Sequence, residues 1–282
     1  MTPGENISVI IQCKGRSQHV LSSVESLKNN FPVIIIVDYN CPDNISKLVK
    51  AKYPHLHCVK ETQDKFYNAS KARNLGLKAA RTPIVFFKDA DLILSPSFIK
   101  KIQSVNFDDY FLLMGRKRAL GANGSVVVST EAANIIGGYD ELFYGYGQQD
   151  IDFFERLKMI GLRPLYAERE PVEVMAHDVS DRSFFHPISR QEALLRNRIY
   201  GYIKRDIMSL TRRYWLPSHY RQELRRKCDA AIDDAFYTQK TELTITIAPE
   251  FSEKEYFSIE NGGNGFNANG HISRSLKYRF SL

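Results

Sequence analysis

Residues 84–91 (IVFFKDAD) constrain the possible folds of this chain more than any other stretch. The first four are apolar and rich in β-branched and aromatic side chains, which predicts a strand buried on both faces, as in parallel sheets. The run ends in Asp89 and Asp91, and an extended backbone places both side chains on one side of the strand. Because open α/β sheets bind ligands at the carboxyl ends of their strands, the pair predicts a ligand site.

The two carboxylates also indicate what this site binds. Carboxylates this close repel each other unless a cation or hydrogen-bond donors hold them, and hard divalent cations prefer carboxylate oxygen. The alternative is that Asp89 and Asp91 merely end the strand. Ser95 and Pro96 follow at once and predict the start of a helix.

Two other apolar runs predict buried strands before the central one. They are residues 7–11 (ISVII) and residues 33–37 (VIIIV). The second run ends at Asp38, a position where a carboxylate commonly accepts hydrogen bonds from a nucleotide. The alternative is that Asp38 only caps the turn formed by residues 40–43.

Residues 68–80 predict a helix just before the central strand. Lys71 and Arg73 lie off its small face and could meet a diphosphate. For these two residues alone, a solvated charged face is the more common arrangement. The small face permits close packing on the sheet and comprises Ala69, Ala72, Gly76 and Ala79.

Residues 138–157 (GYDELFYGYGQQDIDFFERL) form the second informative stretch, a glycine and aromatic loop that runs into a helix. Asp150 lies in or near the first turn, where the helix dipole favours an ionised carboxylate. Asp152 and Arg156 have the spacing of an i,i+4 ion pair, which leaves Asp150 to face the loop. The predicted buried face of this helix comprises Ile151, Phe154 and Leu157.

Residues 172–176 are strand-like and lead to His177. A lone histidine is more often structural than a ligand, and His186 competes with His177 for any ligand role.

The net charge of +7 is concentrated in one segment. Residues 190–227 hold eleven Lys or Arg against three acidic residues, a local charge of +8, so the remainder carries 7 − 8 = −1. This basic segment also carries tyrosine and tryptophan, a mixture suited to a membrane interface, although a solvated helical face is the alternative. We expect an anionic partner such as phospholipid, lipid diphosphate or acidic glycan.

The four cysteines show no paired spacing, which argues against a zinc site or a disulfide framework and suggests a reducing compartment. The N-terminus lacks the pattern of a signal peptide, and no apolar run approaches the roughly 20 residues that span a bilayer. We therefore expect a cytoplasmic protein that binds peripherally to the inner face of the plasma membrane.

Together these motifs resemble the inverting glycosyltransferases of the GT-A fold, the large family-two group, with features of the galactosyltransferase and chondroitin-polymerase branches. The resemblance covers about residues 5 to 185. The elements that carry it, in order, are the first strand, Asp38, residues 72–76 (ARNLG), residues 89–91 (DAD) and residues 143–152 (FYGYGQQDID).

The resemblance implies an α/β GT-A fold, a mixed but mostly parallel sheet flanked by helices, with a basic helical C-terminal extension. It implies a catalytic domain over residues 1–188, whose nucleotide-binding half ends near residue 95. Beyond the resemblance, the residues themselves predict a basic aromatic helical extension over 189–240. In the last segment, 241–282, residues 241–247 (TELTITI) alternate like a half-buried strand and a flexible tail follows.

The resemblance also implies roles for individual residues. Asp150 falls at the catalytic base, and Asp91 and His177 fall at metal ligands for Mn²⁺ or Mg²⁺. Two departures leave the transferred sugar open, since Gln148-Gln149 replaces the family's Gly-Glu and Ile151 replaces an acidic residue. The nucleotide-binding positions are Gln12, Asp38 at the uracil, Arg73 at the uridine or diphosphate, and Asp89 at the ribose or metal.

The expected reaction moves a hexose or N-acetylhexosamine from a UDP-sugar to a hydroxyl of a glycan or lipid-linked saccharide, in surface polysaccharide synthesis. One alternative is a sugar-nucleotide pyrophosphorylase, but residues 12–16 (QCKGR) lack the glycine-rich loop of that class. Another is a non-catalytic module that binds anionic membrane or nucleic acid. That alternative leaves the strand-end aspartates unexplained, and no nucleic-acid motif is visible, so we expect no nucleic-acid partner.

Overall fold

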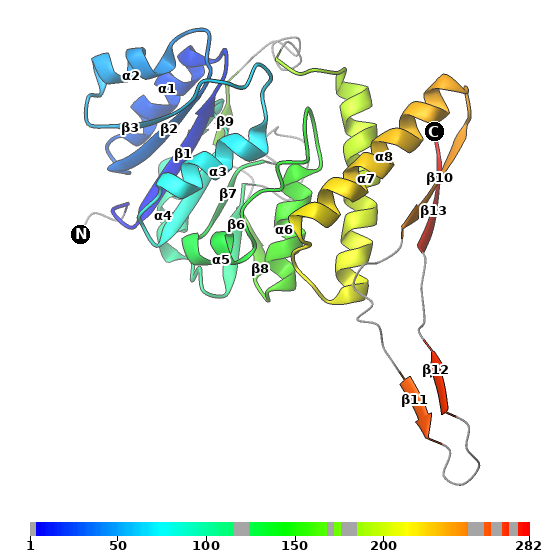
Figure 1. Cartoon of the computed structure of the whole chain (residues 1–282). Helices are drawn as coiled ribbons and strands as arrows, with labels where there is room; N and C mark the ends of the chain where they lie inside the picture. The colour runs from blue at the N-terminus through cyan, green and yellow to red at the C-terminus, as the bar shows by residue number, and fades with distance from the viewer. Residues whose placement is uncertain are drawn as a thin grey trace. The chain divides into compact units, whose positions relative to one another are not determined.

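The structure is a computed structural model, and it describes residues 4–114, 124–167, 172–175, 185–247, 257–260, 267–270 and 276–282. The chain divides into two compact units, Met1–Asn197 and Arg198–Leu282 (Figure 1).

The first unit is built on a seven-stranded sheet with the order β3-β2-β1-β4-β7-β6-β8. All neighbouring strands are parallel except that β7 runs antiparallel to both β4 and β6. This mixed, mostly parallel sheet confirms the expected fold class. Its strands are β1 Ile7–Cys13, β2 Val33–Tyr39, β3 His57–Glu61, β4 Ile84–Lys88, β6 Tyr110–Leu113, β7 Val126–Ser129 and β8 Arg163–Tyr166.

Helices cover both faces of this sheet and enclose two hydrophobic clusters (Figure 1). Successive strand residues alternate between the clusters, so that Phe86 packs on one side and Phe87 on the other. The continuous apolar runs therefore have a simple cause, since both faces of each central strand are covered. One face is covered by α1 Ser17–Leu27, α2 Ile45–Lys52 and α4 Pro96–Ser104, the other by α3 Ala69–Ala79, α5 Thr130–Ile135 and α6 Gln149–Met159.

Helix α3 packs unusually close to the sheet. Asn68 caps it by accepting a hydrogen bond from the Lys71 amide at 3.0 Å. A Cβ atom added at Gly76 would lie 2.2 Å from Cγ2 of Ile10 on β1, so only glycine fits there. The predicted close contact of the small face is thus present, and it brings Arg73 of the same helix against the sheet.

Helix α6 buries a different face from the predicted one. Ile151 is 41% exposed, whereas Phe153 and the Asp152–Arg156 pair are fully buried. Arg156 Nη2 lies 2.8 Å from Asp152 Oδ2, and its Nη1 donates to the carbonyls of Ile136 and Gly138. Because both charges are paired and hydrogen-bonded inside the protein, they can enter the core and leave Ile151 outside. The predicted burial of Ile151 is wrong, while the predicted ion pair is confirmed.

Helix α7, Arg190–Thr211, begins in the first unit and continues into the second, which also holds α8 Ser218–Tyr237 and two β-hairpins. On β10 the residues alternate between exposed and buried, which confirms the predicted half-buried strand. No helix among the described residues is long and apolar enough to cross a membrane. The hairpin strands are β10 Glu242–Ile247 with β13 Leu276–Ser281, and β11 Phe257–Glu260 with β12 Asn267–Gly270.

Part of the basic charge of the second unit is internal. Lys204 is fully buried, and its Nζ lies 5.2 Å from the centre of the Trp215 ring. The Arg221 guanidinium lies 3.9 Å from the centre of the same ring, and that of Arg225 lies 5.5 Å from the Tyr200 ring. These cations stabilise the unit through aromatic contacts and do not form a solvated face.

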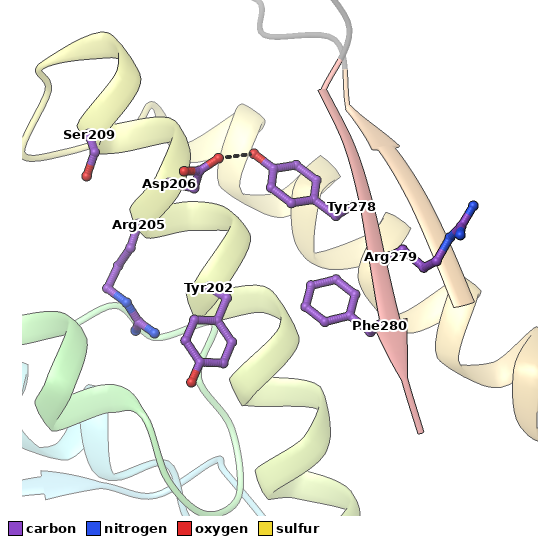
Figure 2. A pocket seen from close by; sticks show the side chains of 7 residues that line it. All are labelled: Tyr202, Arg205, Asp206, Ser209, Tyr278, Arg279 and Phe280. Atoms are coloured by element: carbon purple, nitrogen blue, oxygen red, sulfur yellow. Dashed lines mark hydrogen bonds between the residues drawn. The ribbon is translucent and has the colours of Figure 1, made fainter. Parts of the chain in front are cut away.

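A cleft of about 440 Å³ lies between α7 and β13 within the second unit (Figure 2). The side chains of Tyr278 and Phe280 point toward α7, while that of Arg279 points away, as alternation along a strand requires. The Tyr278 hydroxyl donates to Asp206 Oδ2 at 2.7 Å. The remaining lining residues are Tyr202, Arg205 and Ser209.

Candidate active site

The predicted site residues gather at the carboxyl ends of β1, β2 and β4. After β1 the chain builds β2 and β3 on one side, then returns to place β4 on the other, so β1 and β4 flank a topological switch point (Figure 1). Gln12 lies near the end of β1, and Asp38 lies near the end of β2, next to Cys13 in the register. Asp89 and Asp91 follow β4 directly. Switch points of this kind are where doubly wound sheets bind ligands.

Asp38 holds the loop that follows β2. Its carboxylate accepts hydrogen bonds from the amide of Cys41 at 3.0 Å and from the amide of Ser46 at 3.3 Å. The turn-capping role that the sequence left open is therefore present. Contact with a nucleotide base stays a prediction for this residue.

Arg73 is the centre of the candidate site. Its Nη1 lies 2.5 Å from Asp150 Oδ1, and its Nη2 lies 3.1 Å from Asp89 Oδ1. The Arg73 side chain is only 4% exposed, against 22% for each carboxylate. A Cβ atom at Gly124 would lie 2.8 to 3.2 Å from all three side chains, so a glycine is needed beside them. Residues 77 positions apart thus form one cluster, in which the cation is buried and the carboxylates are partly exposed.

The burial of Arg73 differs from the solvated arrangement that is more common for such a residue. The sequence held a sign of this burial. Arg73 lies four residues after Ala69 and three before Gly76, and this helical spacing places it at the edge of the small face that packs on the sheet. Two carboxylates and the Gly124 carbonyl accept hydrogen bonds from the two terminal nitrogens of the guanidinium, which also lies 4.9 Å from the centre of the Tyr139 ring. These partners allow its burial.

The environment of Asp150 makes it a plausible proton acceptor near neutral pH. Burial raises the pKa of its carboxyl to about 6, and the charge of Asp89 adds to this rise, while the Arg73 guanidinium opposes it. The pKa of Arg73 is raised because its two carboxylate neighbours outweigh its burial. A carboxylate of pKa near 6 is ionised at pH 7 and basic enough to accept a proton from a reacting group.

Lys88 holds the turn that carries Asp89 and Asp91. Its fully buried ammonium donates to the carbonyl of Asp89 at 3.2 Å, to that of Leu92 at 2.5 Å and to Ser23 Oγ at 2.5 Å. Burial lowers the pKa of Lys88 to about 7, against the opposing charges of Asp89 and Asp91. The turn is thus tied to α1 by one internal cation, a contact that the sequence reasoning missed.

Asp91 is the more buried of the two strand-end aspartates, with Arg16 Nη1 at 3.6 Å from its Oδ2. The oxygen donors of Asp89 and Asp91 fit the ligand preference of Mn²⁺ or Mg²⁺. Within the described part of the chain, no group of three or more His, Cys, Asp or Glu side chains is arranged to hold a metal ion. His177 lies outside the described residues. His186 is described, and its ring centre lies 6.0 Å from that of Tyr67.

The aromatic loop before α6 is shaped by backbone conformation and by α7. Gly145, Gly147 and Gln148 all have positive φ, of 71°, 93° and 74°. The Asn197 side chain donates to three carbonyls of this loop, those of Tyr144, Tyr146 and Gly147, at 2.8 to 3.2 Å. No local pattern marks Asn197, because its partners are backbone atoms about 50 residues away. It was therefore missed by the sequence reasoning.

Comparisons with known proteins agree with this geometry. Residues 8–140 match the family described as glycosyl transferase family 2. Residues 104–185 match the family described as the N-terminal domain of galactosyltransferase, and this second match includes the aromatic loop and Asp150. A comparison with curated protein sequences gave no match.

Two solved structures are similar to this chain. The TarS protein of S. aureus, residues 1–349 in complex with UDP-GlcNAc, has a TM-score of 0.55 at 16% identity, over 82% of this chain and 73% of TarS. The mannosyltransferase PcManGT of Pyrobaculum calidifontis, in complex with GDP-Man and Mn²⁺, has a TM-score of 0.52 at 14% identity. The match covers 83% of this chain and 72% of that chain. At these identities the likeness establishes the fold. With the two family matches, it identifies this chain as a glycosyltransferase of the GT-A fold, similar to family two.

Proposed function

We propose that this chain is a metal-dependent inverting glycosyltransferase that moves a hexose or N-acetylhexosamine from a UDP-sugar to a hydroxyl of a glycan or lipid-linked saccharide. The observation that carries the proposal is the cluster of buried Arg73 with the partly exposed Asp89 and Asp150 at the switch point of the sheet. It sets a carboxylate of raised pKa beside the strand end that carries the predicted donor-binding residues.

Asp150 is the proposed catalytic base. It accepts the proton of the acceptor hydroxyl, whose oxygen attacks the anomeric carbon on the face opposite the leaving diphosphate, so the configuration inverts. Arg73 keeps Asp150 in position and in its ionised form, since the pair lies 2.5 Å apart. A general base of this kind contributes roughly two to four orders of magnitude in rate.

Asp91 and His177 are the proposed metal ligands, with Asp89 beside them. A Mn²⁺ or Mg²⁺ ion held there would supply positive charge to stabilise the departing diphosphate. The path of the chain supports this pairing, because β5 Leu92–Leu94 pairs with β9 Val172–Val174 and the Met175 amide donates to the Asp91 carbonyl at 2.8 Å. His177 follows Met175 by two residues. The PcManGT complex with Mn²⁺ supports a metal in this fold.

Gln12, Asp38, Arg73 and Asp89 are the proposed contacts to the nucleotide. The two similar structures hold different donors, UDP-GlcNAc in TarS and GDP-Man in PcManGT. We favour UDP because residues 104–185 match the galactosyltransferase family and because the TarS complex holds UDP-GlcNAc. Synthesis of a surface polysaccharide is the setting that we propose for this reaction.

We further propose that the enzyme works in the cytoplasm and binds the inner, anionic face of the plasma membrane. The support is the end of α7 and the turn before α8, where Arg212, Arg213 and Tyr214 are exposed in the turn and Leu210, near the end of the helix, is 61% exposed. Basic and apolar side chains in one exposed turn suit a membrane interface. No nucleic-acid partner is proposed.

A thermal-shift screen tests the donor and the metal together. UDP, UDP-sugars and GDP-sugars are each added with Mn²⁺ or with EDTA, and a bound ligand raises the Tm according to its concentration and Kd. We expect UDP with Mn²⁺ to stabilise the protein more than UDP with EDTA, and Asp91→Ala to lose this difference. Equal stabilisation by UDP in EDTA contradicts the metal assignment, and stabilisation by GDP-sugars alone contradicts the donor assignment.

A further inference from the structure

Two of the four cysteines are in contact although 28 residues separate them. The sulfur atoms of Cys13 and Cys41 lie 3.6 Å apart, and both cysteines are free. Cys13 ends β1, and Cys41 lies in the loop after β2, at the edge of the sheet that carries the proposed nucleotide contacts. Cys13 is 1% exposed and Cys41 is 7% exposed. The spacing of cysteines in the sequence hides this pair, because adjacent parallel strands bring the two together.

The surroundings of the two sulfur atoms differ. Cys41 Sγ accepts a hydrogen bond from the Gly15 amide at 3.3 Å and lies 3.7 Å from Ser17 Oγ, in the first residue of α1. A helix start and an amide donor both favour a thiolate. The hydrogen bond from Cys13 lowers the pKa of Cys41 to about 6, with the Gly15 amide adding to this, while the same bond and burial raise the pKa of Cys13. The pair thus combines a thiolate with a neighbouring thiol.

The same two cysteines lie next to the proposed nucleotide site. The Cys41 amide donates to Asp38 Oδ1 at 3.0 Å, so Cys41 helps to fix the carboxylate proposed to contact the base. Cys13 follows Gln12 and lies beside Asp38 in the register between β1 and β2. A movement of either sulfur therefore shifts the loops on both sides of this subsite.

We propose that Cys13 and Cys41 are a redox modification site, at which a reversible disulfide forms and weakens binding of the donor nucleotide. The effect on the nucleotide rests on the proposed function, whereas the disulfide itself does not. A disulfide has an S–S distance of about 2.05 Å, so the sulfur atoms must approach by about 1.5 Å. Since the Asp38 carboxylate accepts a hydrogen bond from the Cys41 amide, a movement of Cys41 displaces the donor that holds this carboxylate.

A hydroperoxide such as H₂O₂ is the oxidant in this proposal. The Cys41 thiolate attacks one peroxide oxygen, the O–O bond breaks, and the leaving oxygen is protonated to water, which leaves a sulfenic acid on Cys41. The Cys13 sulfur then loses its proton and attacks the Cys41 sulfur, and the hydroxide that leaves takes that proton as water. Two thiols lose two electrons and two protons, and one H₂O₂ becomes two waters.

The test uses the full chain, treated with H₂O₂, alkylated and digested without reduction for peptide mass spectrometry. We expect a linked peptide pair that contains Cys13 and Cys41, and its loss after dithiothreitol. Cys41→Ser should abolish the link, whereas the matched controls Cys58→Ser and Cys228→Ser should keep it. If peroxide oxidises the protein elsewhere but yields no Cys13–Cys41 link, the two thiols are inert core residues and the proposal is wrong.

A binding measurement tests the consequence. We expect the linked protein to bind UDP with Mn²⁺ at least tenfold more weakly than the reduced protein, and dithiothreitol to restore the affinity. Peroxide should leave the UDP affinity of Cys41→Ser unchanged. A linked protein that binds UDP as well as the reduced one overturns the coupling. If the reduced protein binds no nucleotide at all, the proposed function fails, and the peptide link alone decides whether the pair is a redox site.

Discussion

Replacing Asp150 by asparagine should make the stability of the protein less dependent on pH while it removes the transfer activity. Asparagine has nearly the same shape and caps a helix as well as aspartate, but it carries no charge and accepts no proton. In the folded protein the carboxyl of Asp150 has a pKa of about 6, against an ordinary value of 3.8. Ionisation of this group is therefore unfavourable in the folded state relative to the unfolded state.

The magnitude follows from the two pKa values. Between about pH 4 and pH 6 the folded protein binds more protons at Asp150 than the unfolded protein does, so stability falls as the pH rises through this range. The full loss is (6 − 3.8) × 1.36, about 3 kcal/mol, and about half of it develops between pH 5 and pH 8. Asparagine does not ionise and so avoids this loss. The Tm of the variant minus the Tm of the parent should therefore be roughly 3 to 6 °C larger at pH 8 than at pH 5.

The assay compares thermal melting of parent and Asp150→Asn at both pH values, together with sugar transfer at pH 7.5. Transfer should fall by roughly two to four orders of magnitude, with UDP binding close to normal. The matched control is Asp152→Asn on the same helix, which leaves Arg156 buried without its charged partner and should destabilise at every pH by about 3 to 5 kcal/mol.

Two outcomes would refute the reasoning. A difference in Tm between Asp150→Asn and the parent that does not change with pH means that Asp150 is not a strained, ionised carboxylate. Transfer at close to the parent rate, with a verified donor and acceptor, means that the catalytic base lies elsewhere.

Three further predictions concern other residues of the chain. Lys88→Met should weaken the stabilisation by UDP that depends on Mn²⁺, because it removes the three hydrogen bonds that hold the turn; the thermal-shift screen measures this, and an unchanged response contradicts it. Asn197→Ala leaves three loop carbonyls without their donor and should destabilise by about 1 to 3 kcal/mol, measured as a fall in Tm, whereas an unchanged Tm means that water replaces the side chain. Arg212→Glu combined with Arg213→Glu should reduce flotation with anionic liposomes at low salt and leave transfer to a soluble acceptor unchanged; flotation equal to that of the parent rules out this turn as the membrane contact.

The sheet could be predicted from the sequence because its signal is local. The first four residues of β4 are all apolar and rich in β-branched and aromatic side chains, a composition that favours a strand covered on both faces. The two strands predicted before the central one, the helix before β4 and the position of Asp150 at the start of α6 are all present. In each case a short stretch carries enough hydrophobic pattern or capping chemistry to identify the element.

The wrong and missing predictions share a different cause, which is pairing between distant polar groups. Ile151 was expected inside because it shares an apolar spacing with Phe154 and Leu157, yet Asp152 and Arg156 pair with each other in the core and Ile151 is exposed. Arg73 is buried because it pairs with two carboxylates, which lie 16 and 77 residues away in the sequence. The Asn197 side chain donates hydrogen bonds to carbonyls of the aromatic loop before α6. Such partners become visible only when the fold brings them together.

The reversed direction of β7 affects how this enzyme can be altered. Because β7 is antiparallel to β4, the start of β7 lies at the edge of the sheet where β4 ends. Ser125 Oγ, just before β7, accepts a hydrogen bond from the Asp89 amide, and the Gly124 carbonyl accepts one from Arg73. The wall of the site is therefore attached to the connection between β6 and β7. Changes at Gly124 or Ser125, the described end of that connection, therefore act on Arg73 and Asp89 while the sheet keeps its register, which makes these two positions the natural place to vary the shape of the wall.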